Sequence, residues 1–159
     1  MGTAEGEHAV LQSLMKLMAT LNVQDSMDRG TLILIYQNSR DLGIKEGKKL
    51  DRANNIATAM EVIKKSPWGE VWSIELWRDQ GQTADTFIDE DGRQSAWLVW
   101  RECPVRQVCL TEGVAQDGVM CHMSYRMFAG ILSTVLDSKV DITPISVGPN
   151  ACKKKVTWR

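Results

Sequence analysis

The spacing of apolar residues changes near Pro67, and this change limits the folds that the chain can adopt. Before Pro67, apolar residues recur every three or four positions, as they do on one face of a helix. This period predicts three helices, over 8–21, 29–42 and 51–65. After Pro67, apolar and polar residues alternate over 71–78, as they do in a half-buried strand. We therefore expect an α+β fold in which N-terminal helices pack on an antiparallel sheet.

The ends of the predicted helices are marked by residues with known positional preferences. Gly43 is suited to end the second helix, because glycine is favoured just after the last helical turn. Asp51 is suited to cap the third helix, because a carboxylate can accept hydrogen bonds from the first free backbone N–H groups. Residues 45–49 would then form a charged loop.

The rest of the chain is expected to combine strands with one long, late helix. Pro104 is suited to the first position of a short helix. Residues 95–101 fit either a strand or a short helix. The chain should end in a β-hairpin, whose first strand is interrupted by Pro144. The predicted elements are strands over 71–78 and 82–88, helices over 103–110 and 121–136, and hairpin strands over 140–147 and 152–158.

Length and composition favour a single domain over 1–159, with a flexible tail at 1–7. The net charge of −1 gives nucleic-acid binding no electrostatic support. No apolar run approaches the roughly 20 residues of a membrane span, and the polar N-terminus lacks a signal peptide's apolar core. We expect a cytoplasmic protein without membrane or nucleic-acid partners, whose thiols stay reduced.

All four cysteines lie in the C-terminal part of the chain, at Cys103, Cys109, Cys121 and Cys152. Cys103 precedes a proline and Cys121 opens a predicted helix, so both lie where backbone N–H groups can stabilise thiolates. Four thiolates can close a tetrahedral Zn²⁺ site or hold a [4Fe–4S] cluster. We therefore expect one metal site that uses all four.

Three alternatives remain open for these cysteines. They can be small buried apolar residues, or two of them can form a structural disulfide. A cysteine nucleophile would need a histidine within hydrogen-bond reach, and only His8 and His122 exist. Adjacent residues on a helix do not face each other, so Cys121 and His122 make a poor pair. No catalytic residue is assigned.

The C-terminal half resembles a known family. The stretch 121–133 reads Cys-His-Met-Ser-Tyr-Arg-Met-Phe-Ala-Gly-Ile-Leu-Ser, and the hairpin after it carries Asp141, Gly148 and Cys152. This pattern resembles the 4-vinyl reductase domain, a small-molecule-binding domain of phenol- and hydrocarbon-sensing regulators and of bacteriochlorophyll-biosynthesis proteins. The resemblance covers residue 30 to the end. It implies a domain that holds an apolar or planar ligand between helices and sheet.

The resemblance also implies a zinc site, from which this chain departs. In the family the ligands would be Cys121, an acid at Asp141, a middle cysteine and Cys152, but Pro144 replaces the middle cysteine. We expect Cys103 and the following Cys109 to take over, which leaves Zn²⁺ and [4Fe–4S] both open. The Cys-Pro-x4-Cys element at 103–109 is similar to one in L-2-amino-thiazoline-4-carboxylate hydrolase-like proteins.

Tryptophans suggest where a ligand would bind. Trp72, Trp97 and Trp100 are the expected ligand-binding residues, because a tryptophan-lined pocket suits a planar ring system. We therefore predict a non-catalytic protein that binds a hydrophobic or tetrapyrrole-like molecule. Family members are often dimers, so a homodimer is expected, with the methionine-rich helix over 8–21 as its interface. The alternative is a small enzyme, either a cysteine-dependent hydrolase or an iron–sulfur redox protein.

Overall fold

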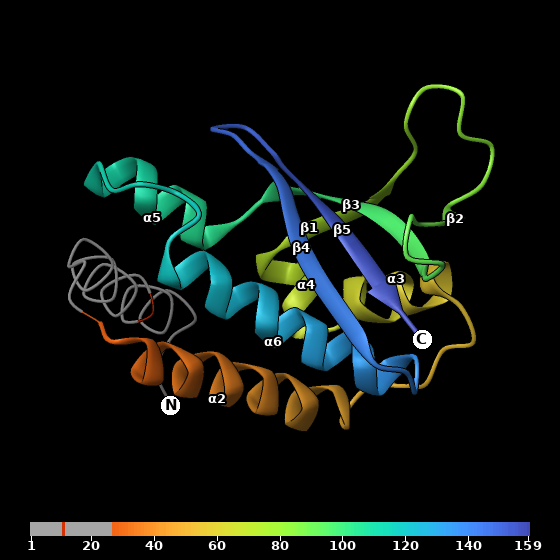
Figure 1. The fold of residues 1–159 in the computed structure, drawn as a ribbon, viewed down its shortest axis with the longest axis horizontal. Helices are drawn as coiled ribbons and strands as arrows, with labels where there is room; N and C mark the ends of the chain where they lie inside the picture. The colour runs from red at the N-terminus through yellow and green to blue at the C-terminus, as the bar shows by residue number, and fades with distance from the viewer. Residues whose placement is uncertain (1–10, 12–26) are drawn as a thin grey trace.

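Five strands form one antiparallel sheet, and the helices lie on one side of it (Figure 1). The computed structural model describes Leu11 and residues 27–159. The strand order is β1-β3-β5-β4, and β2 pairs with the first residues of β3. The helices are α2 (Arg29–Gly47), α3 (Ile56–Lys64), α4 (Pro67–Val71), α5 (Pro104–Glu112) and α6 (Val119–Val135). The strands are β1 (Ser73–Trp77), β2 (Thr86–Ile88), β3 (Gln94–Glu102), β4 (Val140–Val147) and β5 (Cys152–Trp158).

The predicted α+β class is confirmed, with helices first, a late helix and a C-terminal hairpin. Residues 95–101, which fitted a strand or a helix, belong to the central strand β3. The predicted helix over 8–21 lies outside the described residues, apart from Leu11. The main core lies between the sheet and the helices α3 and α6. Its largest fully buried side chains include Trp100, Phe128, Ile56, Leu98, Ile131 and Leu132.

The prediction that Gly43 ends the second helix is wrong, because α2 continues to Gly47. The buried residues of α2 are Ser39, Gly43 and Gly47, which are spaced four apart and lie on one face. A Cβ at Gly43 would lie 2.8 Å from the carbonyl carbon of Met127 in α6, and closer still to its oxygen. Gly43 is therefore explained by the close approach of two helices. The predicted loop over 45–49 is largely the last turn of α2.

The third helix begins later than predicted, at Ile56 instead of 51. The cap is Asn55, whose side chain accepts a hydrogen bond from the N–H of Thr58 at 2.8 Å. The segment before this helix is bound to the end of α6, because the N–H of Ala53 donates to the carbonyl oxygen of Val135 at 2.9 Å. The strand predicted over 82–88 is also shorter, because only Thr86–Ile88 pairs with β3.

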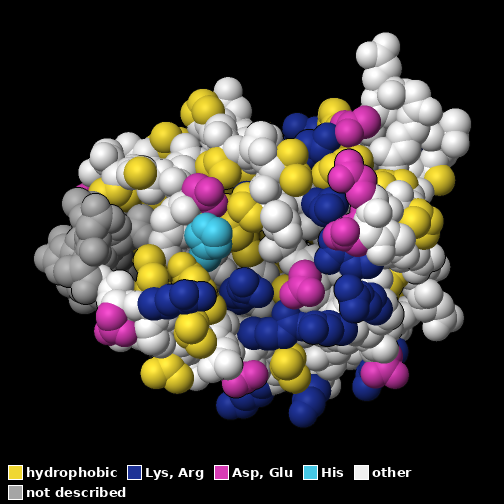
Figure 2. Space-filling model, viewed as in Figure 1, with side chains coloured by type: hydrophobic (Ala, Val, Ile, Leu, Met, Phe, Trp, Pro, Cys, Tyr) yellow, Lys and Arg dark blue, Asp and Glu magenta, His cyan; other side chains and the backbone are white. Residues whose placement is uncertain are grey.

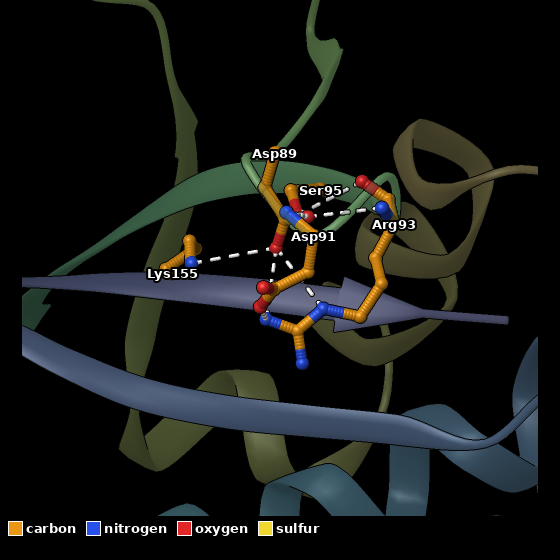
Figure 3. Close-up of polar contacts among 5 residues, drawn as sticks. All are labelled: Asp89, Asp91, Arg93, Ser95 and Lys155. Atoms are coloured by element: carbon orange, nitrogen blue, oxygen red, sulfur yellow. Dashed lines mark hydrogen bonds and ion pairs between the residues drawn. The ribbon is translucent and has the colours of Figure 1, made fainter.

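Polar contacts join α2 to β4 and stabilise the turn before β3. On α2, Arg40 donates to the carbonyl oxygen of Val140 at 2.9 Å and lies 3.7 Å from Asp141. Lys and Arg side chains gather in the lower centre of the face shown in Figure 2, with a few Asp and Glu side chains among them. In the turn between β2 and β3, the Asp89 carboxylate accepts hydrogen bonds from the backbone and side chain of Arg93 (Figure 3). These hydrogen bonds, above all the one from the Arg93 backbone N–H, lower the pKa of Asp89 to about 2.

Candidate functional site

A cavity of about 460 Å³ lies between α3, α4 and β1. This volume falls within the range of small-molecule pockets, about 300–1,000 Å³. Its wall is part apolar and part polar, and its charged residues lie at exposed positions. The apolar lining comprises Ala57, Met60, Ile63, Trp72, Ile74 and Leu76, and the charged lining comprises Glu61, Lys64, Glu75 and Glu102.

Trp72 lines this cavity and carries a buried hydrogen-bond donor. It follows the short helix α4, and its ring lies edge-on to Phe128 with centroids 5.4 Å apart. Its Nε1 is buried and has no hydrogen-bond partner within the described residues. A buried donor without an acceptor costs about 1–3 kcal/mol, so such groups call for an explanation. A bound molecule with an acceptor atom would provide one.

Trp72 and Trp100 meet at the same aromatic ring. Trp100 lies on the helix-facing side of β3, is 2% exposed, and is edge-on to Phe128 at a centroid distance of 5.8 Å. Trp100 also lies 6.4 Å from the ring of Tyr125. Two of the three predicted ligand-binding tryptophans are therefore joined through Phe128.

Trp97 lies on the opposite face of the sheet. Trp97 and Trp100 are three positions apart, and side chains alternate between the two faces of a strand, so they point in opposite directions. The ring of Trp97 is stacked against Phe87 at 4.8 Å, and the Lys153 Nζ lies 4.3 Å from its centroid. One pocket cannot include all three tryptophans, and the alternation in the sequence already contained this information.

The structure brings the four cysteines into one region. Cys103 precedes α5, Cys109 lies within it, Cys121 lies in the first turn of α6 and Cys152 begins β5. All four are free thiols, and Cys103, Cys121 and Cys152 line one small void. Burial, together with the neighbouring Cys121 and Cys103, raises the pKa of Cys109 to about 11. The four thiols therefore lie in one region, and their role as a metal site stays a prediction.

Two buried cations share this void, and sequence analysis did not single them out. Arg106 is 7% exposed and donates to the carbonyl oxygen of Trp100 at 3.0 Å and to the Cys152 Sγ at 3.7 Å. Lys154 is 1% exposed and donates to the Tyr125 hydroxyl at 2.6 Å. Burial lowers the pKa of Lys154. Among the described residues, neither cation forms an ion pair with a carboxylate.

The burial of Lys154 could have been predicted from the alternation of side chains along β5. Cys152, Lys154 and Val156 face the helices, whereas Lys153 and Lys155 face the other side. Only the middle lysine of the run Lys153–Lys155 is therefore buried. The partners of Arg106 depend on how α5 folds back on β3, which no local pattern shows.

Thiol chemistry suits zinc or an iron–sulfur cluster, but the side chains are not arranged as a metal centre. Within the part of the chain that the structure describes, no group of three or more His, Cys, Asp or Glu side chains is placed to hold a metal ion. Asp141 forms its ion pair with Arg40. The nearest acid to the His122 Nε2 is Asp117 at 3.3 Å, and His8 lies outside the described residues.

No described helix combines the length and apolar character needed to cross a membrane.

No protein-family model matches the chain, and no curated protein matches it. The chain is similar in fold to a solved structure, the phenol-responsive sensory domain of the transcription activator PoxR with phenol. The TM-score is 0.54 at 15% sequence identity, over 94% of this chain and 73% of that chain. This likeness concerns the fold, and membership of the 4-vinyl reductase family stays a prediction.

Proposed function

We propose that this protein binds a small, planar, largely apolar molecule in the cavity between α3, α4 and β1. The observation that carries the proposal is a cavity of ligand-like size lined by Trp72, whose buried Nε1–H has no acceptor among the described residues. The apolar lining would hold the ring, and an oxygen atom on the ligand would accept from the indole once the Trp72 ring turns to expose its buried Nε1. The cavity volume favours one or two rings over a tetrapyrrole.

The similarity in fold supports this choice of function. The PoxR domain is described as phenol-responsive, and its fold matches most of this chain. A shared fold can host different functions, so the proposal depends on the cavity and on Trp72. Trp100 is proposed as a supporting residue, since it packs against the same Phe128 ring as Trp72.

Calorimetric titration with phenol and toluene tests the proposal, because the two rings are similar in size and only phenol carries an oxygen. Trp72→Phe keeps an aromatic ring and removes the N–H. We expect phenol to bind about fivefold more weakly to this variant, since one hydrogen bond contributes about 1 kcal/mol, whereas toluene should be unaffected. Trp77→Phe is the matched control, because its Nε1 already donates to Asp79 at 3.1 Å. Failure of phenol to bind, or equal binding by wild type and Trp72→Phe, would reject the proposal.

We also propose that the four cysteines hold Zn²⁺ or a [4Fe–4S] cluster after their side chains rearrange. The specific support is electrostatic, since Arg106 and Lys154 are buried beside three thiols and have no carboxylate partner in the part of the chain that the structure describes. Buried charges are normally compensated, and thiolates around a metal ion would supply negative charge there. Such a site would pin α5 to α6 and β5.

Metal analysis of protein purified without oxygen tests this second proposal. About four irons per chain would identify a cluster, and one zinc would identify a zinc site. Cys152→Ser should lower metal content and thermal stability together. Metal-free protein with four titratable thiols would refute it. Homodimer formation and cytoplasmic location stay predictions, and sedimentation velocity would test the first.

A further inference from the structure

More acidic than basic residues line the cavity. Three carboxylates and one ammonium line it, namely Glu61, Glu75, Glu102 and Lys64. Glu75 is neutralised by Arg101, whose Nε lies 2.7 Å from it. Within the described residues, Glu61 and Glu102 form no ion pair. These exposed charged residues form the rim of the cavity, and the electrostatic potential at this rim is therefore negative on balance.

The end of α3 adds to this potential. The cavity is lined by Ile63 and Lys64 from the last turn of α3 and by Gly69 from α4. The C-terminal end of a helix carries a partial negative charge, which Ser66 reduces here by donating its N–H and hydroxyl to the Ile63 carbonyl oxygen. A side chain at Gly69 would collide with the carbonyl group of Lys64, so the two backbones approach closely there. The absence of a side chain at Gly69 lets α4 lie directly against the end of α3.

We infer that the ligand of this cavity is an aromatic amine, in which a planar ring carries a cationic nitrogen on a short side chain. The inference rests on the proposed function, because it concerns the same cavity. The ring would lie against the apolar wall, and an oxygen on it would accept from Trp72. The ammonium would lie near Glu61 and Glu102, and the end of α3 would favour it further.

Three phenols that share a two-carbon linker and differ in the group at its end test the inference. These are 4-ethylphenol, 4-(2-aminoethyl)phenol and 3-(4-hydroxyphenyl)propionate, which are neutral, cationic and anionic at pH 7. Calorimetry at low salt should show the cation binding about three- to tenfold more tightly than the neutral compound, and the anion more weakly. The preference should shrink at high salt, because the rim carboxylates are exposed.

Variants at the rim locate the effect. Glu61→Gln and Glu102→Gln should each weaken binding of the amine by about two- to fivefold and leave 4-ethylphenol unchanged. Glu90→Gln, in the exposed turn before β3, is the control and should change neither. Binding of 4-ethylphenol without any preference for the amine, or a preference that survives both rim substitutions, would overturn this inference and leave the proposed function standing. Failure of all three compounds to bind would reject both.

Discussion

Substitution of Gly43 by alanine tests how closely α2 and α6 must approach. The new Cβ would lie 2.8 Å from the carbonyl carbon of Met127, and ordinary van der Waals contact begins at 3.4 Å. The carbonyl oxygen of Met127 would be nearer still, so the helices must separate by more than about half an ångström, and a gap of that size forfeits a quarter or more of each contact's attraction. Overpacking of this kind costs up to about 3 kcal/mol. Alanine regains about 1 kcal/mol through helix propensity, so we expect a net loss of about 2 kcal/mol.

Urea unfolding followed by circular dichroism measures this loss. A loss of about 2 kcal/mol should lower the melting temperature by about 4–8 °C in a chain of this size. Asn38→Ala, at an exposed position in the middle of α2, is the matched control and should be slightly stabilising. If Gly43→Ala were as stable as the wild type or more stable, the explanation of Gly43 by close helix packing would be refuted.

Further substitutions test other parts of the structure. The pKa of Asp89 is lowered to about 2 from 3.8, so the free energy of unfolding should fall as pH drops from about 4 to about 2, and Asp89→Asn should flatten this dependence in acid titrations of stability. Lys154→Met removes a buried ammonium, so metal-free protein should become more stable by about 1 kcal/mol in urea unfolding; destabilisation would show that the hydrogen bond to Tyr125 outweighs the desolvation cost. In metal-free native protein, iodoacetamide should modify Cys103 first, because the other three thiols are buried, and mass spectrometry of the peptides would reveal equal rates if this is wrong.

Sequence patterns were sufficient for the class of fold and for most elements. The change from helical period to alternation near Pro67 separates helices from sheet because each periodicity reflects one buried face. Helix ends were less predictable. Gly43 fits a helix end as well as a close helix contact, and only the position of Met127 in α6 distinguishes the two.

The candidate site was predictable in part. Clustering of cysteines along the chain indicated that they meet, and three of them line one void. The separation of Trp97 from Trp100 follows from their odd spacing along β3. The cavity beside Trp72 could not be predicted, because it depends on how α3 and α4 pack against β1, and no local pattern encodes the missing acceptor at Nε1.

The most direct test of the central claim is the indole N–H resonance of Trp72 during a phenol titration. In ¹⁵N-labelled protein, each of the six tryptophans gives one indole signal, and Trp72→Phe assigns the relevant one by its loss. We predict that this signal moves downfield and saturates as phenol is added, because the N–H gains an acceptor, while the signal of Trp77 stays in place. An unchanged Trp72 signal at saturating phenol would contradict the account.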